Sequence, residues 1–289
     1  MEIIKINNLT KDYGNGKGIF DVTFTIKKGE IFGFLGPNGA GKTTTIRHLL
    51  GFIIPKEKKC IINGLDCNKD IDLIQKKIGY IPGEINLMEE ISGIQFIKFM
   101  ADYRGMKNLG RANELIKRFE LDPRCKIKKM SKGMKQKVGI VIAFMHDPDI
   151  LILDEPTSGL DPIFRNELLN IFRDFVSDDE HSILFSTHIT SDLEHVADYI
   201  TFIHQGKIIF SLDKDVLTDE FGLVKCNSKD FSRFDKEDYI KYQKLNYHYR
   251  VLVKDRKRFK AKYDIKTIDK PSLEDIMLTF IKGDRKWIR

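Results

Sequence analysis

The chain has 289 residues, of which 42% are apolar and 31% are charged, a composition that is ordinary for a globular protein and excludes wholesale disorder. This length allows one large α/β domain with a small appendage. The longest apolar runs, such as residues 150–153, are far shorter than the ~20 residues of a membrane helix. The charged start at residues 1–7 lacks a basic segment followed by an apolar one, so we expect no secretory signal.

The positive charge is uneven along the chain. The formal net charge is +7, and residues 212–289 alone carry 20 Lys or Arg against 14 Asp or Glu. A basic segment of this kind can meet nucleic acid, anionic lipid or an acidic partner surface, although a solvated basic face is the plainer interpretation. The four cysteines (Cys60, Cys67, Cys125 and Cys226) are scattered without a CxxC pair. This favours free thiols in a reducing cytosol over a zinc site.

Apolar spacing predicts an α/β core that is interrupted by a helical block. Alternation predicts strands in an N-terminal antiparallel β part, and a further strand leads into a helix. Between about residues 87 and 135 the spacing becomes helical. Strands that are apolar on both faces, as central parallel strands are, then alternate with helices. The expected strands are residues 3–6, 22–26, 30–35, 150–153, 182–185 and 200–203, and the first helix is about 42–50.

A domain boundary is expected near Leu212, after the turn Gln205-Gly206. Residues 212–289 would then form a small α/β accessory subdomain, with a strand at 247–253. A helix should begin after Pro271, because Ser272 is a good N-cap and acidic residues follow it in the first turn. Its apolar positions form one face. Either the tail's own strands or another subunit must cover that face, which comprises Leu273, Ile276, Met277 and Phe280.

A glycine-rich loop lies between an apolar strand and a helix. Its sequence is Gly36-Pro37-Asn38-Gly39-Ala40-Gly41-Lys42-Thr43. Glycines let the backbone turn its N–H groups toward phosphate oxygens at the positive end of a helix. In such a loop Lys42 reaches the β and γ phosphates and the Thr43 hydroxyl binds magnesium. The phosphate-binding residues are then Asn38, Gly39, Ala40, Gly41, Lys42, Thr43 and Thr44.

Two adjacent carboxylates end the buried strand 150–153. Doubly wound sheets bind ligands at the carboxyl ends of their strands, so Asp154 and Glu155 should face the glycine-rich loop. Asp154 suits magnesium coordination, and Glu155 is placed to polarise an attacking water. Together with the loop, the pair predicts a nucleotide site.

In order and spacing, residues 1–210 resemble the ATP-binding subunits of ABC transporters. The stretch 158–161, with sequence Ser-Gly-Leu-Asp, looks like the D-loop of this family. His188 ends the following strand as the family's switch histidine does, which implies that it contacts the γ phosphate. Tyr13 stands where the family keeps an aromatic residue that stacks on adenine. The implied fold is a P-loop NTPase core, residues 1–211, with an inserted helical subdomain at about 87–135.

Two segments depart from the family pattern. The signature segment 130–134 reads Met-Ser-Lys-Gly-Met, with Lys132 in place of the first glycine of the usual LSGGQ. Ser131 and Gly133 are kept, and the resemblance implies that they face the ATP held by the other subunit. After residues 78–82 the family has a glutamine that senses magnesium; here Gly83 takes its place, and the next residue, Glu84, is a substitute candidate for the metal.

The resemblance, with its similarity to exporters of drugs, antibiotics and small peptides, implies an ATPase that uses ATP and Mg²⁺. The chain would form a head-to-tail homodimer or heterodimer and drive a separate transmembrane permease at the cytoplasmic face of the membrane. The helical block and the loop 83–90 would receive the permease. The alternative is an ABC-type ATPase that acts on nucleic acid or ribosomes. One phosphate loop and no sustained heptad run oppose it, so we expect no nucleic-acid partner. A binding-only scaffold would be expected to lack Lys42 or Glu155.

Overall fold

The computed structural model describes residues 1–55 and 59–283. The chain divides into two compact units, Met1–Ser211 and the residues from Leu212 onward. Each unit is described by itself below. Within the described residues, no helix is both long enough and apolar enough to cross a membrane.

A six-stranded sheet forms the centre of the first unit, with strand order β10-β9-β3-β8-β7-β6. The four central pairings among β9, β3, β8, β7 and β6 are all parallel. β3, β7 and β8 are buried along their whole length, as strands covered on both faces must be. The strands are β3 (Ile31–Leu35), β6 (Ile78–Ile81), β7 (Ile150–Asp154), β8 (Ser182–Thr187), β9 (Tyr199–His204) and β10 (Lys207–Asp213).

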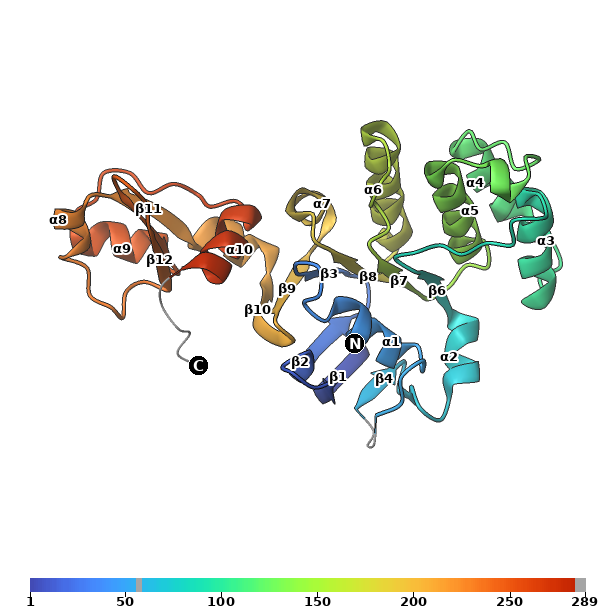
Figure 1. The fold of residues 1–289 in the computed structure, drawn as a ribbon, viewed down its shortest axis with the longest axis horizontal. Helices are drawn as coiled ribbons and strands as arrows, with labels where there is room; N and C mark the ends of the chain where they lie inside the picture. Colours follow the sequence, from blue (N-terminus) through green and yellow to red (C-terminus); the bar gives the residue numbers. More distant parts are fainter. Residues whose placement is uncertain (56–58, 284–289) are drawn as a thin grey trace. The chain divides into compact units, whose positions relative to one another are not determined.

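Antiparallel strands cover one face of this sheet, and helices cover the other. In Figure 1, α6 and α7 lie above the central sheet, while α1 and the antiparallel strands lie below it. The antiparallel sheet has the order β2-β1-β4-β5. Its core is shared with α1 and β3, and the ring of Phe24 stacks on that of Phe32 at 5.0 Å. The elements are β1 (Glu2–Asp12), β2 (Gly18–Lys27), β4 (Cys60–Ile62), β5 (Leu65–Asp66), α1 (Lys42–Leu49), α2 (Ile71–Lys77), α6 (Pro162–Val176) and α7 (Thr190–Val196).

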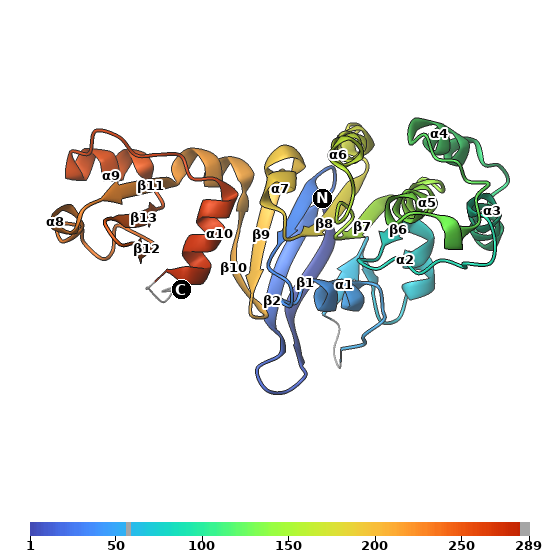
Figure 2. The same ribbon diagram turned by 45° about the horizontal axis from the view of Figure 1, so that its top comes forward.

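The predicted helical block is inserted between β6 and β7, as Figure 2 shows on the right. It contains α3 (Gly93–Tyr103), α4 (Gly110–Arg118), a 3-10 turn at Ile127–Lys129 and α5 (Lys132–Phe144). Ser92 forms a capping box with Gln95 at the start of α3, and Ser131 caps α5.

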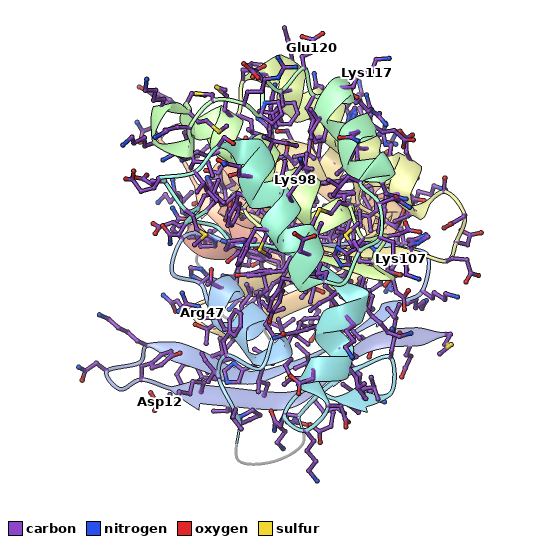
Figure 3. The ribbon with its side chains drawn as sticks, turned by 90° about the vertical axis from the view of Figure 1, so that its right-hand side faces the viewer. Asp12, Arg47, Lys98, Lys107, Lys117 and Glu120 are labelled. Atoms are coloured by element: carbon purple, nitrogen blue, oxygen red, sulfur yellow. The ribbon has the colours of Figure 1, made fainter. Side chains whose placement is uncertain are left out.

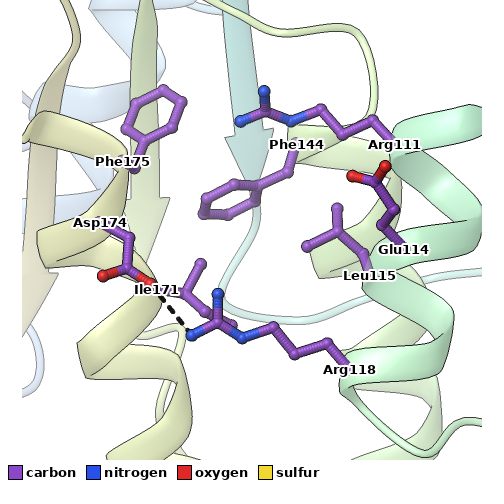
Figure 4. A pocket seen from close by; sticks show the side chains of 8 residues that line it. All are labelled: Arg111, Glu114, Leu115, Arg118, Phe144, Ile171, Asp174 and Phe175. Atoms are coloured by element: carbon purple, nitrogen blue, oxygen red, sulfur yellow. Dashed lines mark hydrogen bonds and ion pairs between the residues drawn. The ribbon is translucent and has the colours of Figure 1, made fainter. Parts of the chain in front are cut away.

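The block contacts the core helix α6 through side chains of α4. Arg118 binds Asp174 at 3.0 Å and Glu167 at 2.5 Å. Figure 4 shows the ion pair with Asp174 beside a cavity of about 230 Å³ between the two helices. Because all three charged side chains are partly exposed, these pairs contribute little stability and mainly orient α4 against α6.

The C-terminal unit has its own small core. Its three-stranded antiparallel sheet has the order β11-β13-β12. Val224, Val251 and Phe259 are buried in a cluster rich in aromatic side chains. The elements are a π-helical turn (Val216–Glu220), β11 (Gly222–Cys226), α8 (Ser228–Phe231), β12 (Lys241–Lys244), β13 (Tyr249–Val253), α9 (Arg256–Tyr263) and α10 (Leu273–Lys282).

Helix α10 begins where its capping residues predict. The hydroxyl oxygen of Ser272 accepts a hydrogen bond from the N–H of Asp275, and the carboxylate of Asp275 accepts one from the N–H of Ser272. Leu273, Ile276 and Phe280 are buried, and α10 packs against β12. The apolar face of α10 is therefore covered by the chain's own residues, and not by another subunit. The strand expected at 247–253 begins slightly later, at Tyr249, because the preceding residues turn from β12 into β13.

Candidate functional site

The glycine-rich loop joins β3 to α1 at the carboxyl edge of the central sheet. Gly41 has φ +114°, and a Cβ atom there would come within 2.5 Å of Ile19. A Cβ at Gly36 would lie 2.6 Å from the carbonyl oxygen of Ile203. Both positions therefore require glycine. No side chain caps the N-terminus of α1, so its N–H groups are available to an anion.

Lys42 is held above this loop. Its Nζ donates to the carbonyl oxygens of Gly36 at 2.7 Å and Pro37 at 3.3 Å. The same Nζ lies 3.0 Å from Oε1 of Glu155. Since the Lys42 side chain is nearly buried, its charge needs an anion close by, and Glu155 provides one.

Asp154 lies at the end of β7 and meets two hydroxyl groups. Oδ2 accepts a hydrogen bond of 2.7 Å from the hydroxyl of Thr43, and Oδ1 accepts one from Ser186. Sequence reasoning missed Ser186. Ser186 could have been found from its position on β8, the parallel neighbour of β7, where it is in register with Asp154. Burial raises the pKa of Tyr80 to about 12, and the charge of Asp154 adds to that effect.

Glu155 follows β7 with a left-handed backbone, φ +51°. Such a conformation is costly for a residue with a side chain and persists only where the surroundings hold it. Here the Glu155 N–H donates to the carbonyl oxygen of Ser186 at 2.9 Å. Its Oε2 lies 2.7 Å from Nδ1 of His188. The predicted water-orienting carboxylate and the predicted switch histidine are therefore direct neighbours.

An open cavity of about 470 Å³ lies over these residues. Its volume is in the range of small-molecule sites. Tyr13 is 54% exposed at its rim, where a ring could stack on a base, and Nζ of Lys11 lies 5.5 Å from the ring centre. Lys17 and Gln205 also line the cavity, and the sequence analysis assigned neither of them to the site. The complete lining is Tyr13, Gly16, Lys17, Gly18, Asn38, Gly39, Ala40, Gly41, Lys42, Thr43, Thr44, Glu155 and Gln205.

The signature segment does not line this cavity. Ser131 is the N-cap of α5 and accepts a bond from the N–H of Met134. A Cβ at Gly133 would meet only the Ser131 hydroxyl, at 3.9 Å, so the backbone there is open to an approaching group. Lys132, the departure from the family pattern, lies against Gly159 of the loop 158–161. Its Nζ is 3.0 Å from where a Cβ of Gly159 would be.

Glu84 is exposed and, among the described residues, is not part of the cavity lining. The neighbouring Gly83 is closer to the carboxylates, since a Cβ there would lie 3.7 Å from Oδ2 of Asp154. Any influence of Glu84 on Asp154 would therefore pass through the loop backbone.

Comparisons with known proteins identify the family of the chain. The sequence model of the family described as "ABC transporter" matches residues 19–158. The chain is 37% identical to the bacitracin transport ATP-binding protein of Bacillus licheniformis, over 74% of this chain and 71% of the relative. The chain belongs to the ABC transporter family.

Two further ABC transporter relatives differ in how much of this chain their similarity covers. The lantibiotic transport ATP-binding protein of Streptococcus pyogenes is 38% identical over 74% of this chain and 92% of the relative. An uncharacterised ABC transporter ATP-binding protein of Methanocaldococcus jannaschii is 31% identical over 95% of this chain and 98% of its own length. The similarity to this second relative therefore includes the C-terminal unit.

Solved ABC transporter structures share the fold of the first unit. The ATP-binding subunit of an ABC transporter superposes with a TM-score of 0.68 at 32% identity, covering 74% of this chain and 91% of that one. A dimeric cassette in a post-hydrolysis state, bound to ADP and Pi, gives a TM-score of 0.65 at 24% identity and covers 73% and 98%. The predicted fold, a P-loop α/β core with a helical insertion and an antiparallel part, is confirmed.

Proposed function

We propose that this ATP-binding protein hydrolyses ATP to drive an ABC exporter through a separate membrane permease. The observation that carries the proposal is a chain of contacts at the edge of one cavity. Lys42 and Glu155 line the cavity with Nζ and Oε1 3.0 Å apart, and Oε2 of the same Glu155 lies 2.7 Å from Nδ1 of His188. This is the arrangement expected of a phosphate site with a water-orienting carboxylate beside it. The antibiotic and lantibiotic transport roles in the names of the relatives support export as the process.

In the proposed reaction Lys42 and the N–H groups of the loop bind the phosphates. Glu155 orients the attacking water, and His188, which contacts Glu155, faces the γ phosphate. Tyr13 stacks on adenine at the cavity rim. Positioning and charge stabilisation account for most catalysis of phosphoryl transfer, so a prearranged set of this kind is sufficient.

The residues present fit Mg²⁺. Thr43 and Asp154 offer hard oxygen donors 2.7 Å apart, and magnesium prefers one or two carboxylates together with phosphate and water oxygens. The described residues contain no group of three or more His, Cys, Asp or Glu side chains suited to a metal, which agrees with a site completed by the nucleotide. Magnesium would neutralise charge on the phosphates.

We further propose a head-to-tail dimer, either of two identical chains or with a second ATPase. Ser131 and Gly133 lie outside the chain's own cavity yet are exposed or partly exposed and backed by an N-capped helix. They would complete the cavity of the other copy with N–H groups aimed at its γ phosphate. The dimeric state of the cassette bound to ADP and Pi supports this assembly.

The permease would dock on the helical block and the loop 83–90, at the cytoplasmic face of the membrane. Figure 3 shows α2 and α3 running across one face, with Lys98 of α3 on it. Large apolar side chains stay exposed in and near these segments, which is the usual mark of a protein interface. They are Phe52, Ile54, Leu73, Met88, Phe99 and Tyr103.

The test is isolation of the tagged chain from detergent-solubilised membranes of the cells that produce it, together with any membrane protein bound to it. We expect a stable complex whose ATPase activity drives export from loaded vesicles. The double variant Phe99→Ser, Tyr103→Ser should lose the permease and keep ATP binding. An ATPase that never associates with a membrane protein, yet hydrolyses ATP faster with RNA, would instead support the nucleic-acid alternative.

A further inference from the structure

A buried carboxylate outside the cavity joins three segments of the first unit. Asp192 of α7 is 1% exposed. Its Oδ2 accepts a hydrogen bond of 2.6 Å from the hydroxyl of Thr157, which is itself buried. Its Oδ1 accepts one of 2.5 Å from Nε of Arg165, whose Nη2 donates to Ser191. α6 and α7 lie side by side above the sheet (Figure 1), so these bonds connect neighbouring helices.

The two partners of Asp192 flank the loop 158–161. Thr157 immediately precedes this loop, and Arg165 lies in the first turn of the helix that follows it. The carboxylate of Asp192 therefore forms hydrogen bonds with residues at both ends of the loop 158–161. Between these ends Gly159 has φ +77° and lies against Lys132 of the signature segment.

The same bonds connect the segments that carry the two catalytic candidates. Thr157 lies two residues after Glu155, and Asp192 lies four residues after His188. The Ser158 N–H donates to the Glu155 carbonyl oxygen at 3.1 Å, so the start of the loop and the left-handed Glu155 backbone form one turn. A shift of Thr157 would change that turn, and with it the contact between Glu155 and His188.

We propose that Asp192, acting through Thr157 and Arg165, is a positioning residue that fixes the loop 158–161 and the relative placement of Glu155 and His188. This inference rests on the proposed ATPase function. Two charge-assisted hydrogen bonds in a buried setting are short and directional, and they hold three backbone segments in one arrangement. Neither Asp192 nor Thr157 lines the nucleotide cavity, so the effect is on the chemical step and not on ATP binding.

The test compares steady-state ATP hydrolysis of the full chain and its variants. Thr157→Val keeps the branched shape and removes only the hydroxyl, leaving the ion pair of Asp192 with Arg165 in place. We expect kcat to fall about tenfold or more while KM for ATP stays within about twofold. Thr157→Ser restores the hydroxyl and should restore most of kcat. Asp192→Asn leaves one oxygen to accept hydrogen bonds in place of two, so it should lower kcat at least as much as Thr157→Val does.

Asp174→Asn is the matched control. Asp174 is a carboxylate on α6 that also pairs with an arginine, Arg118, but it is 64% exposed and is remote in sequence from the loop 158–161 (Figure 4). This variant should keep the kcat of the unmodified chain. An equal loss of kcat in Asp174→Asn would overturn the proposal, because weakening any contact of α6 would then be enough to lower kcat.

The remaining outcomes separate this inference from the function on which it rests. Unchanged kcat in Thr157→Val overturns it even if Asp192→Asn fails to fold, since Asp192 would then serve stability alone. A raised KM with unchanged kcat, or no rescue by Thr157→Ser, also overturns it. A chain without ATPase activity, or one in which Glu155→Gln is as active as the original, would overturn the proposed function and this inference together.

Discussion

The amino group of Lys42 lies 3.0 Å from Oε1 of Glu155, and both side chains are largely shielded from water. A buried lysine is costly without an anion, and Glu155 supplies it within the chain. A phosphate group bound in the cavity would compete with Glu155 for the same amino group. The two residues that we assign to binding and to hydrolysis are therefore electrostatically coupled.

The first prediction follows for Glu155→Gln. The change keeps the shape of the side chain but removes the charge that competes with phosphate, so ATP should bind at least as tightly. Hydrolysis should fall by about a hundredfold or more, the typical contribution of a positioned general base. Nucleotide titration, phosphate release and gel filtration with ATP would measure binding, turnover and accumulation of a dimer. Undiminished turnover would show that the role of Glu155 is wrong.

The second prediction concerns Lys42→Ala. Removing a charged donor to phosphate should weaken ATP binding by about tenfold or more, because bonds to charged groups contribute about 1.5–3 kcal/mol. Isothermal titration with ATP and ADP would measure the loss. Lys17→Ala is the comparison, since Lys17 also lines the cavity but is exposed and should matter less. Equal affinity in the Lys42→Ala protein and the original chain would remove Lys42 from the phosphate site.

The third prediction tests Glu84 as a substitute for the family's glutamine. Glu84 follows Gly83, which lies beside Asp154, so movement of this loop would reach the carboxylate that we propose for magnesium. Glu84→Ala should lower ATPase activity and transport in the permease complex more than it lowers ATP affinity. Glu2→Ala, at an exposed carboxylate outside the loop 83–90 and the helical block, serves as control. If both variants behave alike, Glu84 is an ordinary surface carboxylate.

The fourth prediction is a pH dependence of stability that arises at His146. Burial lowers the pKa of His146 from 6.5 to about 4, and the charge of Arg104 adds to this effect. Between these two values the unfolded chain binds a proton that the folded chain does not. Stability should therefore be complete above pH ~6.5 and should fall as the pH drops toward 4.

Urea unfolding at pH 7.5 and pH 5 would measure this effect. His146→Gln should show a smaller difference between the two pH values, whereas His195→Gln, at an exposed position, should behave like the original chain. An identical pH dependence in all three proteins would mean that other groups account for the loss.

The sequence predicted those parts of the site that depend on local order along the chain. A glycine-rich turn between strand and helix fixes the position of Lys42, and a buried strand delivers Asp154 to the same sheet edge. The contacts of Ser186, Lys132 and Asp192 could not be predicted in this way. Each depends on which way a side chain points after strands and helices have packed, and apolar spacing does not specify that. The left-handed backbone of Glu155 is equally invisible in a pattern of residue types.

The last prediction concerns the C-terminal unit, for which we propose an accessory role in assembly. Its core is formed by its own residues, and β10 ends at Asp213, so a chain cut after Asp213 should still fold and bind ATP. Tyr247 is 93% exposed and Leu245 40% exposed at the turn between β12 and β13, which suits a contact with another subunit.

In a Glu155→Gln background, the shortened chain should dimerise with ATP more weakly than the full chain, as analytical ultracentrifugation can measure. The double variant Leu245→Ser, Tyr247→Ser in the full chain is the sharper form of this experiment, because it leaves the core of the unit intact. It should reproduce the weakened dimerisation if the turn makes the contact. A shortened chain that dimerises as well as the full one would mean that the unit only covers its own core, with its basic residues in solvent.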